Sequence, residues 1–210
     1  MSIGLQITDS IKTIEKNINK AVADLANDII TKNIGKITQS VKNLIPAWIT
    51  SQPEIQSLLS SDPSSLAGQF GIPGGTQSIV NSIVHSVVDS TEVKFVKYTA
   101  NLTGGLELGF QPSNFANLLS LPDGHTIYSG GDLHWLDWLL KRGDTTIIAN
   151  FQYNPRTGLG RSGLGNMISG GFFRVPPQFS GTDNDNFITR AFIGVNQEKQ
   201  ITSILEKVLQ

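Results

Sequence analysis

The sequence contains no cysteine among its 210 residues. This absence excludes disulfides, thiolate nucleophiles and the common zinc and iron–sulfur sites that cysteine ligates, and it fits a cytosolic protein whose fold relies on packing alone. Charged residues are also scarce, at 16% of the chain against a usual fraction of about a quarter. A polar but weakly charged surface tolerates contact with other subunits.

An excess of charge of one sign is lacking as well, because 16 basic and 17 acidic residues leave a formal net charge of −1. Such a chain has no global field that attracts nucleic acid or an anionic membrane, so we expect no specific nucleic-acid partner and no membrane. No run approaches the roughly 20 apolar residues of a membrane span, and the first residues lack the pattern of a secretory signal. We therefore expect neither export by that route nor a membrane-spanning segment.

The clearest periodic pattern is a row of apolar residues near the N-terminus, spaced by three and four positions. It predicts one face of an amphipathic helix, with Thr8 or Ser10 as the N-cap. The pattern resumes after Gly35 and continues to Trp48, so one bent helix or two helices are expected, and Pro46 marks a helix start or a kink. A helix so rich in isoleucine needs to lay its apolar row on its own domain or on a neighbour. The row is Ile7, Ile11, Ile14, Ile18, Val22, Leu25 and Ile29.

The patterns together predict an α+β fold with a long N-terminal amphipathic helix, or two helices, a small, mostly antiparallel sheet packed by helices, and a C-terminal helix. We divide the chain into an N-terminal helical arm, 1–50, and a core domain, 51–210, with a glycine-rich extended loop at 154–181. The expected core elements are short helical turns at 51–75, a helix at 76–90 capped by Thr76, a bulged hairpin of 93–99 and 105–110, a strand at 145–153 and a helix at 197–209.

A further helix is expected at 132–143, where tryptophans and leucines form one face. Asp132, His134 and Asp137 invite interpretation as a metal site, but Asp132 is better placed as the N-cap of this helix. His85 lies beside the apolar face of the 76–90 helix and is expected to be a polar residue at the edge of the core. We therefore expect no bound metal.

The glycine tract from Gly158 to Gly163 matches the GxGxxG pattern of dinucleotide-binding turns. That motif requires a tight strand-to-helix turn, whereas the following LGNMISGGFF is too rich in glycine to form the helix. Ser162 lies in GRSGL, which differs from the nucleophile pattern GxSxG. Asp183 and Asp185 fit a capping run before a helix, with Thr182 or Asp183 as the cap. We expect no cofactor and no catalytic residue, and hence a protein that is not an enzyme.

The N-terminal helix is followed by WITSQPEIQSL, and further on come GDLHWLDWLLKRGD and RSGLGNM…FRVPPQFSGTDNDNFITRA. In these stretches the chain resembles small neck and tail-completion proteins of tailed bacteriophages, which are head–tail connector components. The resemblance implies a virion structural protein, assembled in the host cytoplasm into a homo-oligomeric ring at the head–tail junction or the tail end. It also implies other phage neck, tail or head-connector proteins as partners, and it carries no catalytic residues.

For such a subunit, we assign subunit contacts to the apolar row of the N-terminal helix and to the segment 158–179, whose glycines would form the hinge of a docking arm. Three arginines are candidate polar anchors, since a guanidinium holds a carboxylate or several carbonyls. The candidates are Ile11, Ile14, Ile18, Val22, Leu25, Arg161, Phe172, Phe173, Arg174, Pro176, Pro177, Phe179 and Arg190. Replacing Phe172 and Phe173 with serine is expected to leave a folded subunit that no longer assembles.

Two alternatives remain open at this point. One is a nucleotide-binding protein or enzyme that uses the glycine tract, and the other is a membrane-surface helical module that uses the N-terminal helix.

Overall fold

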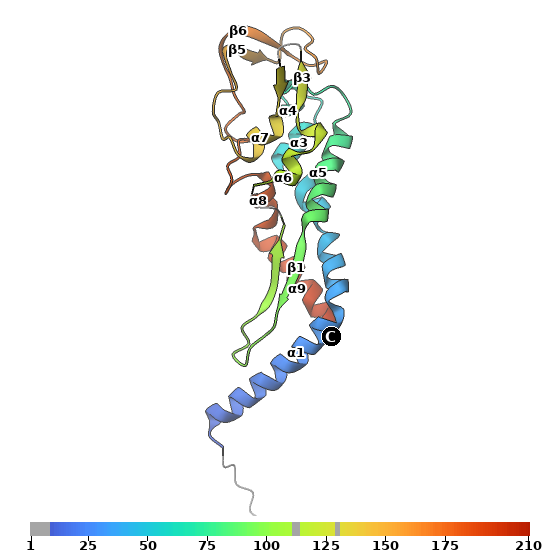
Figure 1. Ribbon diagram of the computed structural model, residues 1–210, viewed down its shortest axis with the longest axis vertical. Helices are drawn as coiled ribbons and strands as arrows, with labels where there is room; N and C mark the ends of the chain where they lie inside the picture. Colours follow the sequence, from blue (N-terminus) through green and yellow to red (C-terminus); the bar gives the residue numbers. More distant parts are fainter. Residues whose placement is uncertain (1–8, 111–113, 129–130) are drawn as a thin grey trace, which may run out of the picture. The chain divides into compact units, whose positions relative to one another are not determined.

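A computed structural model describes residues 9–110, 114–128 and 131–210 (Figure 1). The fold is α+β, as predicted, with three separate two-stranded antiparallel sheets. The chain forms two compact units, each assembled from segments distant in sequence. Unit 1 comprises 1–41, 92–109 and 200–210, and unit 2 comprises 42–91 and 110–199. The units therefore divide the chain differently from the predicted arm of 1–50, because the N-terminal helix shares unit 1 with a hairpin and the C-terminal residues.

Helix α1 (Ile11–Lys42) runs without interruption through Gly35, and the second part of the predicted pattern ends in a separate helix that begins at Ile45. Its first turn is capped as expected by Ser10, whose Oγ accepts a hydrogen bond from the Thr13 backbone N–H. Thr8, the other predicted cap, and Ile7 lie outside the described residues. Neither α1 nor any other helix that the structure describes is both long and apolar enough to cross a membrane.

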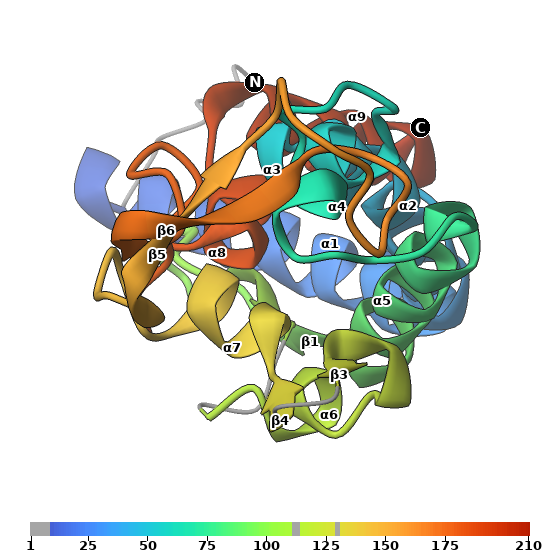
Figure 2. The same cartoon turned by 90° about the horizontal axis from the view of Figure 1, so that it is seen from above.

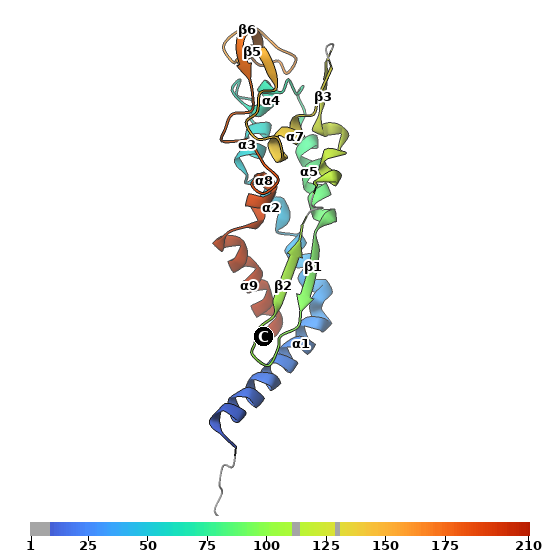
Figure 3. The ribbon, with the colours of Figure 1, turned by 60° about the vertical axis from the view of Figure 1, so that its left-hand side comes forward.

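The core of unit 1 lies between α1, the β1–β2 hairpin and the end of α9 (Val195–Leu209) (Figure 3). Strands β1 (Glu92–Val96) and β2 (Gly105–Gly109) pair antiparallel with a regular register, so the predicted bulge was wrong. Partly buried side chains pack against Ile30, Ile37 and Val41 of α1: they are Val93, Phe95, Tyr98, Leu106, Leu108, Ile204, Leu205 and Val208.

Asn27 of α1 clamps the chain just beyond β1. Its Nδ2 donates to the Tyr98 carbonyl at 3.0 Å, and its Oδ1 accepts from the Tyr98 backbone N–H at 2.7 Å. The side chain thus satisfies a backbone donor and a backbone acceptor that no strand partner covers.

Unit 2 is a helical core that carries two small hairpins. Pro46 lies in the first turn of α2, which is one of the two roles predicted for it. Figure 2 shows β5 and β6 running side by side, and their pairing is antiparallel with a shift between Ala149 and Phe151. The elements are α2 (Ile45–Thr50), α3 (Pro53–Leu59), α4 (Leu66–Gln69), α5 (Thr76–Ser90), α6 (Ala116–Leu119), the 3₁₀ turn η1 (Pro122–Gly124), β3 (Thr126–Tyr128), β4 (Gly131–Leu133), α7 (Trp135–Leu140), β5 (Ile148–Asn154), β6 (Asn166–Phe173) and α8 (Phe187–Phe192).

Two aromatic side chains lie at the centre of unit 2. Trp135 of α7 is fully buried and stacks on Phe70, with 5.7 Å between the ring centroids. Phe187, the first residue of α8, is also fully buried. Each is the first residue of a short helix, α7 or α8, and these two helices are about 50 residues apart in the sequence.

Three predicted helix caps of unit 2 were wrong. Helix α5 follows Gly75, whose φ of 104° is left-handed, so Thr76 is already a helical residue. Helix α8 is capped by Asn186, which accepts from the Ile188 and Thr189 N–H groups and forms a capping box with Thr189. The predicted cap region around Thr182 instead closes a turn of its own with Asp185. Asp132, the third, lies in β4, and the N-cap position of α7 is His134.

Candidate functional site

Helix α1 carries two apolar rows on different faces. The buried row, Ala23, Ile30, Ile37 and Val41, belongs to the inside of unit 1. At 3.6 residues per turn, Ala23 of the buried row is rotated about the helix axis by about a third of a turn from Ile11. Ile11 therefore belongs to a different row on another face of the helix. The second row is largely exposed: Ile11 76%, Ile18 56%, Val22 50% and Leu25 64%, with Ile14 half-buried.

The exposed row of α1 has the spacing of a helix-pairing seam. Ile11, Ile18 and Leu25 recur every seven residues, and Ile14 lies between the first two at the alternate position of a heptad. The rest of this half of the helix carries Lys12, Lys16, Lys20, Glu15, Asp24 and Asp28. Because both signs are present, two copies of this helix do not repel each other through net charge.

Phe172 and Phe173 of β6, predicted to dock together, lie in opposite environments. Phe172 is 67% exposed, whereas Phe173 is 4% exposed and pairs across the sheet with Ile148. Successive side chains of a strand point to opposite faces, so only one of two neighbours enters the core. The expectation that the double serine variant keeps its fold is therefore corrected, since it would place a hydroxyl at the buried Phe173 position.

Two of the three predicted arginine anchors bind groups of their own chain. Arg161 donates from Nε to the Gly71 carbonyl at 3.2 Å and from Nη1 to the Ile127 carbonyl. Arg190 forms an ion pair with Glu54 and another with Asp185 at 2.6 Å. Both guanidiniums therefore act as anchors within the chain, and their assignment to subunit contacts stays a prediction.

The third arginine and the residues after β6 remain at or near the surface. Arg174 is exposed, with its Nη1 3.7 Å from the Asp144 carboxylate. Pro177 is exposed, and Pro176 and Phe179 are half-buried. Their assignment to subunit contacts stays a prediction.

The glycine tract lies in the loop of the β5–β6 hairpin, so it is followed by a strand and lacks the helix that dinucleotide binding requires. The Tyr153 hydroxyl donates to the Pro63 carbonyl at 2.6 Å, and a Cβ at Gly165 or Gly68 would collide with it. The Gly160 N–H donates to two carbonyls of the same loop. Gly160 and Gly165 therefore permit close packing of the loop, and the role of the tract as the hinge of a docking arm stays a prediction.

A cavity of about 360 Å³ lies beside this loop, within unit 2. Tyr153, Arg161 and Phe173 are among its lining residues. The Arg161 guanidinium is already held there by backbone carbonyls, which leaves it poorly placed to bind a phosphate.

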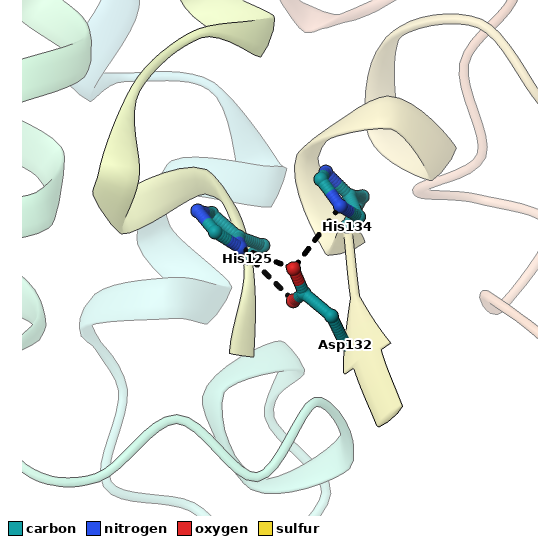
Figure 4. A group of neighbouring side chains, drawn as sticks. All are labelled: His125, Asp132 and His134. Atoms are coloured by element: carbon teal, nitrogen blue, oxygen red, sulfur yellow. Dashed lines mark hydrogen bonds and ion pairs between the residues drawn. The ribbon is translucent and has the colours of Figure 1, made fainter. Parts of the chain in front are cut away.

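Three chemically reactive side chains meet on the β3–β4 hairpin: His125, Asp132 and His134 (Figure 4). Thr126 pairs with Leu133, so the two histidines occupy the next opposed positions, and Asp132 precedes His134 by two residues. Opposed residues and residues two apart lie on one face of a hairpin. The register thus brings all three side chains together.

The Asp132 carboxylate lies between the two imidazoles. The distance from His125 Nδ1 to Oδ2 is 2.8 Å, and that from His134 Nε2 to the same oxygen is 3.2 Å. The rings are nearly parallel, with an interplanar angle of 9° and 4.8 Å between their centroids. His125 is half-buried and the other two are exposed.

Asp132 and His134 also line a cavity of about 650 Å³ in unit 2, together with Asp137 and Arg142. Arg142 Nε lies 2.5 Å from Asp137 Oδ2, so this second carboxylate is already paired. The combination weighed and set aside from the sequence, Asp132 with His134 and Asp137, did not include His125. The register of a hairpin across 125–134 would have placed His125 opposite His134. The sequence interpretation started a helix at Asp132 and so did not consider this hairpin.

Comparisons of the chain with protein-family models, curated proteins and solved structures give no match.

Proposed function

We propose that the protein is a virion structural subunit that assembles with further copies of itself into a ring at a phage head–tail junction or tail end. The observation that carries the proposal is the exposed apolar row of α1, defined by Ile11, Ile14, Ile18, Val22 and Leu25. Exposed apolar side chains that are contiguous and regularly spaced mark an interaction surface, whereas isolated ones do not. The bacteriophage assignment rests on the resemblance of the chain to neck and tail-completion proteins.

A second copy of the chain fits this row better than an unrelated partner does. The heptad spacing is the one that packs helix against helix, and isoleucine at both alternate positions of the first heptad, Ile11 and Ile14, favours bundles of more than two helices. The mixed charges of the helix permit several identical copies to gather around one axis. Repetition of one contact that closes on itself gives a ring.

Light scattering and native mass spectrometry over a range of concentrations test the assembly, with electron microscopy for the shape of the particle. We expect a concentration-dependent oligomer of more than two chains. The variant with Ile11→Ser, Ile18→Ser and Leu25→Ser should remain monomeric and folded, because these side chains are exposed.

The matched control replaces exposed apolar residues elsewhere, with Ile127→Ser, Leu159→Ser and Ile193→Ser. It should assemble like the original chain. A chain that stays monomeric at high concentration, or an α1 variant that assembles normally, contradicts the proposal. Antibody labelling of purified phage particles tests the virion location separately, and particles without label contradict that part.

A further inference from the structure

The geometry of His125, Asp132 and His134 approaches that of a metal centre. Zinc lies about 2.0–2.1 Å from a histidine nitrogen and about 2.0–2.2 Å from a carboxylate oxygen. Tetrahedral angles then place two ligand atoms about 3.4 Å apart. Here the carboxylate oxygen is 2.8 and 3.2 Å from the two nitrogens, and all three ligand atoms lie within 4.8 Å of one another. To surround a zinc ion, the carboxylate oxygen moves a few tenths of an ångström away from the nitrogens, and the most distant ligand atoms, now within 4.8 Å, close toward about 3.4 Å.

The donor set indicates which cations would bind. Two imidazoles and one carboxylate are ligands suited to zinc, nickel and iron(II), whereas magnesium and calcium prefer a shell made of oxygen atoms. Three protein ligands leave a position for water or another donor, as in sites that are not purely structural. The cavity beside Asp132 and His134 supplies room for that fourth ligand.

We propose that His125, Asp132 and His134 form a binding site for a divalent transition-metal cation of the zinc class. The cation joins the residue before β3 to the middle residue of β4 and to the residue after β4, and so fastens the open end of a hairpin with three-residue strands. A hairpin of this length is barely stable without such support. This inference is independent of the assembly role of α1.

Calorimetric titration of ZnCl₂ into the tag-free, EDTA-dialysed chain tests the site. We expect saturable binding of one zinc per chain, and no comparable binding of MgCl₂ or CaCl₂. Removing a ligand by His125→Ala, Asp132→Asn or His134→Ala should weaken zinc binding at least tenfold, the size of effect seen for lesser changes around metal sites. His134 is 59% exposed on its side chain, so its replacement leaves the fold intact.

The chain contains three histidines, and the third provides the matched control. His85 is exposed on α5, away from the cluster in sequence, and His85→Ala should bind zinc like the original chain. Zinc at about 100 times its dissociation constant should raise the melting temperature of the original chain and of His85→Ala by about 5 °C, but not that of His134→Ala.

Cobalt(II) provides a spectroscopic check, because its visible absorption reports coordination by nitrogen and oxygen donors. The three ligand variants, His125→Ala, Asp132→Asn and His134→Ala, should lose that absorption, whereas His85→Ala should keep it. The proposal is overturned by a chain that binds no zinc, by binding that survives all three ligand substitutions, or by binding that disappears with His85→Ala. In the first case the cluster is a carboxylate hydrogen-bonded to His125 and ion-paired with His134, and no more.

Discussion

Units 1 and 2 are stabilised in different ways. Unit 2 buries large aromatic side chains at its centre, including Trp135 and Phe187, and most of the buried apolar residues of the described chain belong to it. The core cluster of unit 1 has three buried residues of α1, and the hairpin and α9 side chains packed against it are only partly buried. Burial of apolar surface is the main favourable term in folding, so the apolar core of unit 2 supplies most of its stability. Unit 1 instead leaves Ile11, Ile18, Val22 and Leu25 exposed, the surface on which the proposed assembly rests.

The largest expected effect concerns the core of unit 2. Phe173→Ala should lower the free energy of unfolding by about 3 kcal/mol, because it empties a buried site. Phe172→Ala, one residue earlier on the exposed face, should change it by less than about 0.5 kcal/mol. Urea denaturation followed by circular dichroism measures both. If both variants lost the same free energy of unfolding, the assignment of Phe173 to the buried face and Phe172 to the exposed face of β6 would be wrong.

The next effect concerns the buried ion pair of unit 2. Glu54 is 1% exposed and is joined to Arg190, and its Oε2 has no hydrogen-bond partner among the described residues. Arg190→Met leaves this carboxylate buried and unpaired, so we expect a loss of about 2–3 kcal/mol in the free energy of unfolding.

Arg174→Met is the matched control, because the Arg174–Asp144 pair is exposed. Such pairs contribute about 0–1 kcal/mol, so the change should be small. A similar loss for both arginines, measured by urea denaturation, would show that burial does not set the strength of the Arg190 contact.

Because the apolar core of unit 1 is small, the hydrogen bonds of one polar side chain, Asn27, should contribute a noticeable share of the stability of this unit. Asn27→Ala removes both hydrogen bonds to the Tyr98 backbone, and we expect a loss of about 1–2 kcal/mol. Hydrogen exchange of the β1–β2 amides should accelerate. Asn33→Ala removes a bond that stays within α1 and should leave this exchange unchanged. Unchanged exchange in Asn27→Ala would contradict the clamp.

The smallest effect is a pH dependence of unit 2. Burial raises the pKa of Glu54 above its ordinary value of 4.5, and Arg190 offsets this only in part. The folded chain therefore holds this proton more tightly than the unfolded chain does. The resulting stabilisation is complete below about pH 4.5 and is lost as the pH rises through the pKa of the folded state.

Glu54→Gln cannot ionise and lacks this dependence. Between pH 4 and 7, we therefore expect the free energy of unfolding of the original chain to fall relative to that of Glu54→Gln. Urea denaturation at several pH values measures the difference, with the exposed Glu107→Gln as the control. Parallel curves for the original chain and Glu54→Gln would contradict the sign or the cause of the pKa shift.

Several elements were predictable because their signals are local. The apolar period of α1, the position of Pro46 and the two runs of the β1–β2 hairpin each indicated the element that forms. Helix starts were less predictable, because several polar residues compete for each cap. Asn186 rather than Thr182 caps α8, since its side chain reaches two N–H groups of the first turn.

The histidine cluster shows why the rest was not predictable. Asp132 stands before a run of tryptophan and leucine that makes a helix, and a capping role there was reasonable. Pairing with β3 takes residues 131–133 into a strand instead. Once that register is set, the positions of His125 and His134 follow, but the register depends on contacts between segments and not on either segment alone.

The sequence by itself determined which residues share a face. It placed the two apolar rows on α1, alternated Phe172 with Phe173 and put histidine at both ends of the β3–β4 segment. Only the tertiary structure decided which face is covered: one row of α1 is buried by the hairpin and α9, Phe173 enters the core, and the two histidines meet at Asp132. The reason is physical, since periodicity is a property of the local backbone, whereas burial requires surfaces from distant parts of the chain.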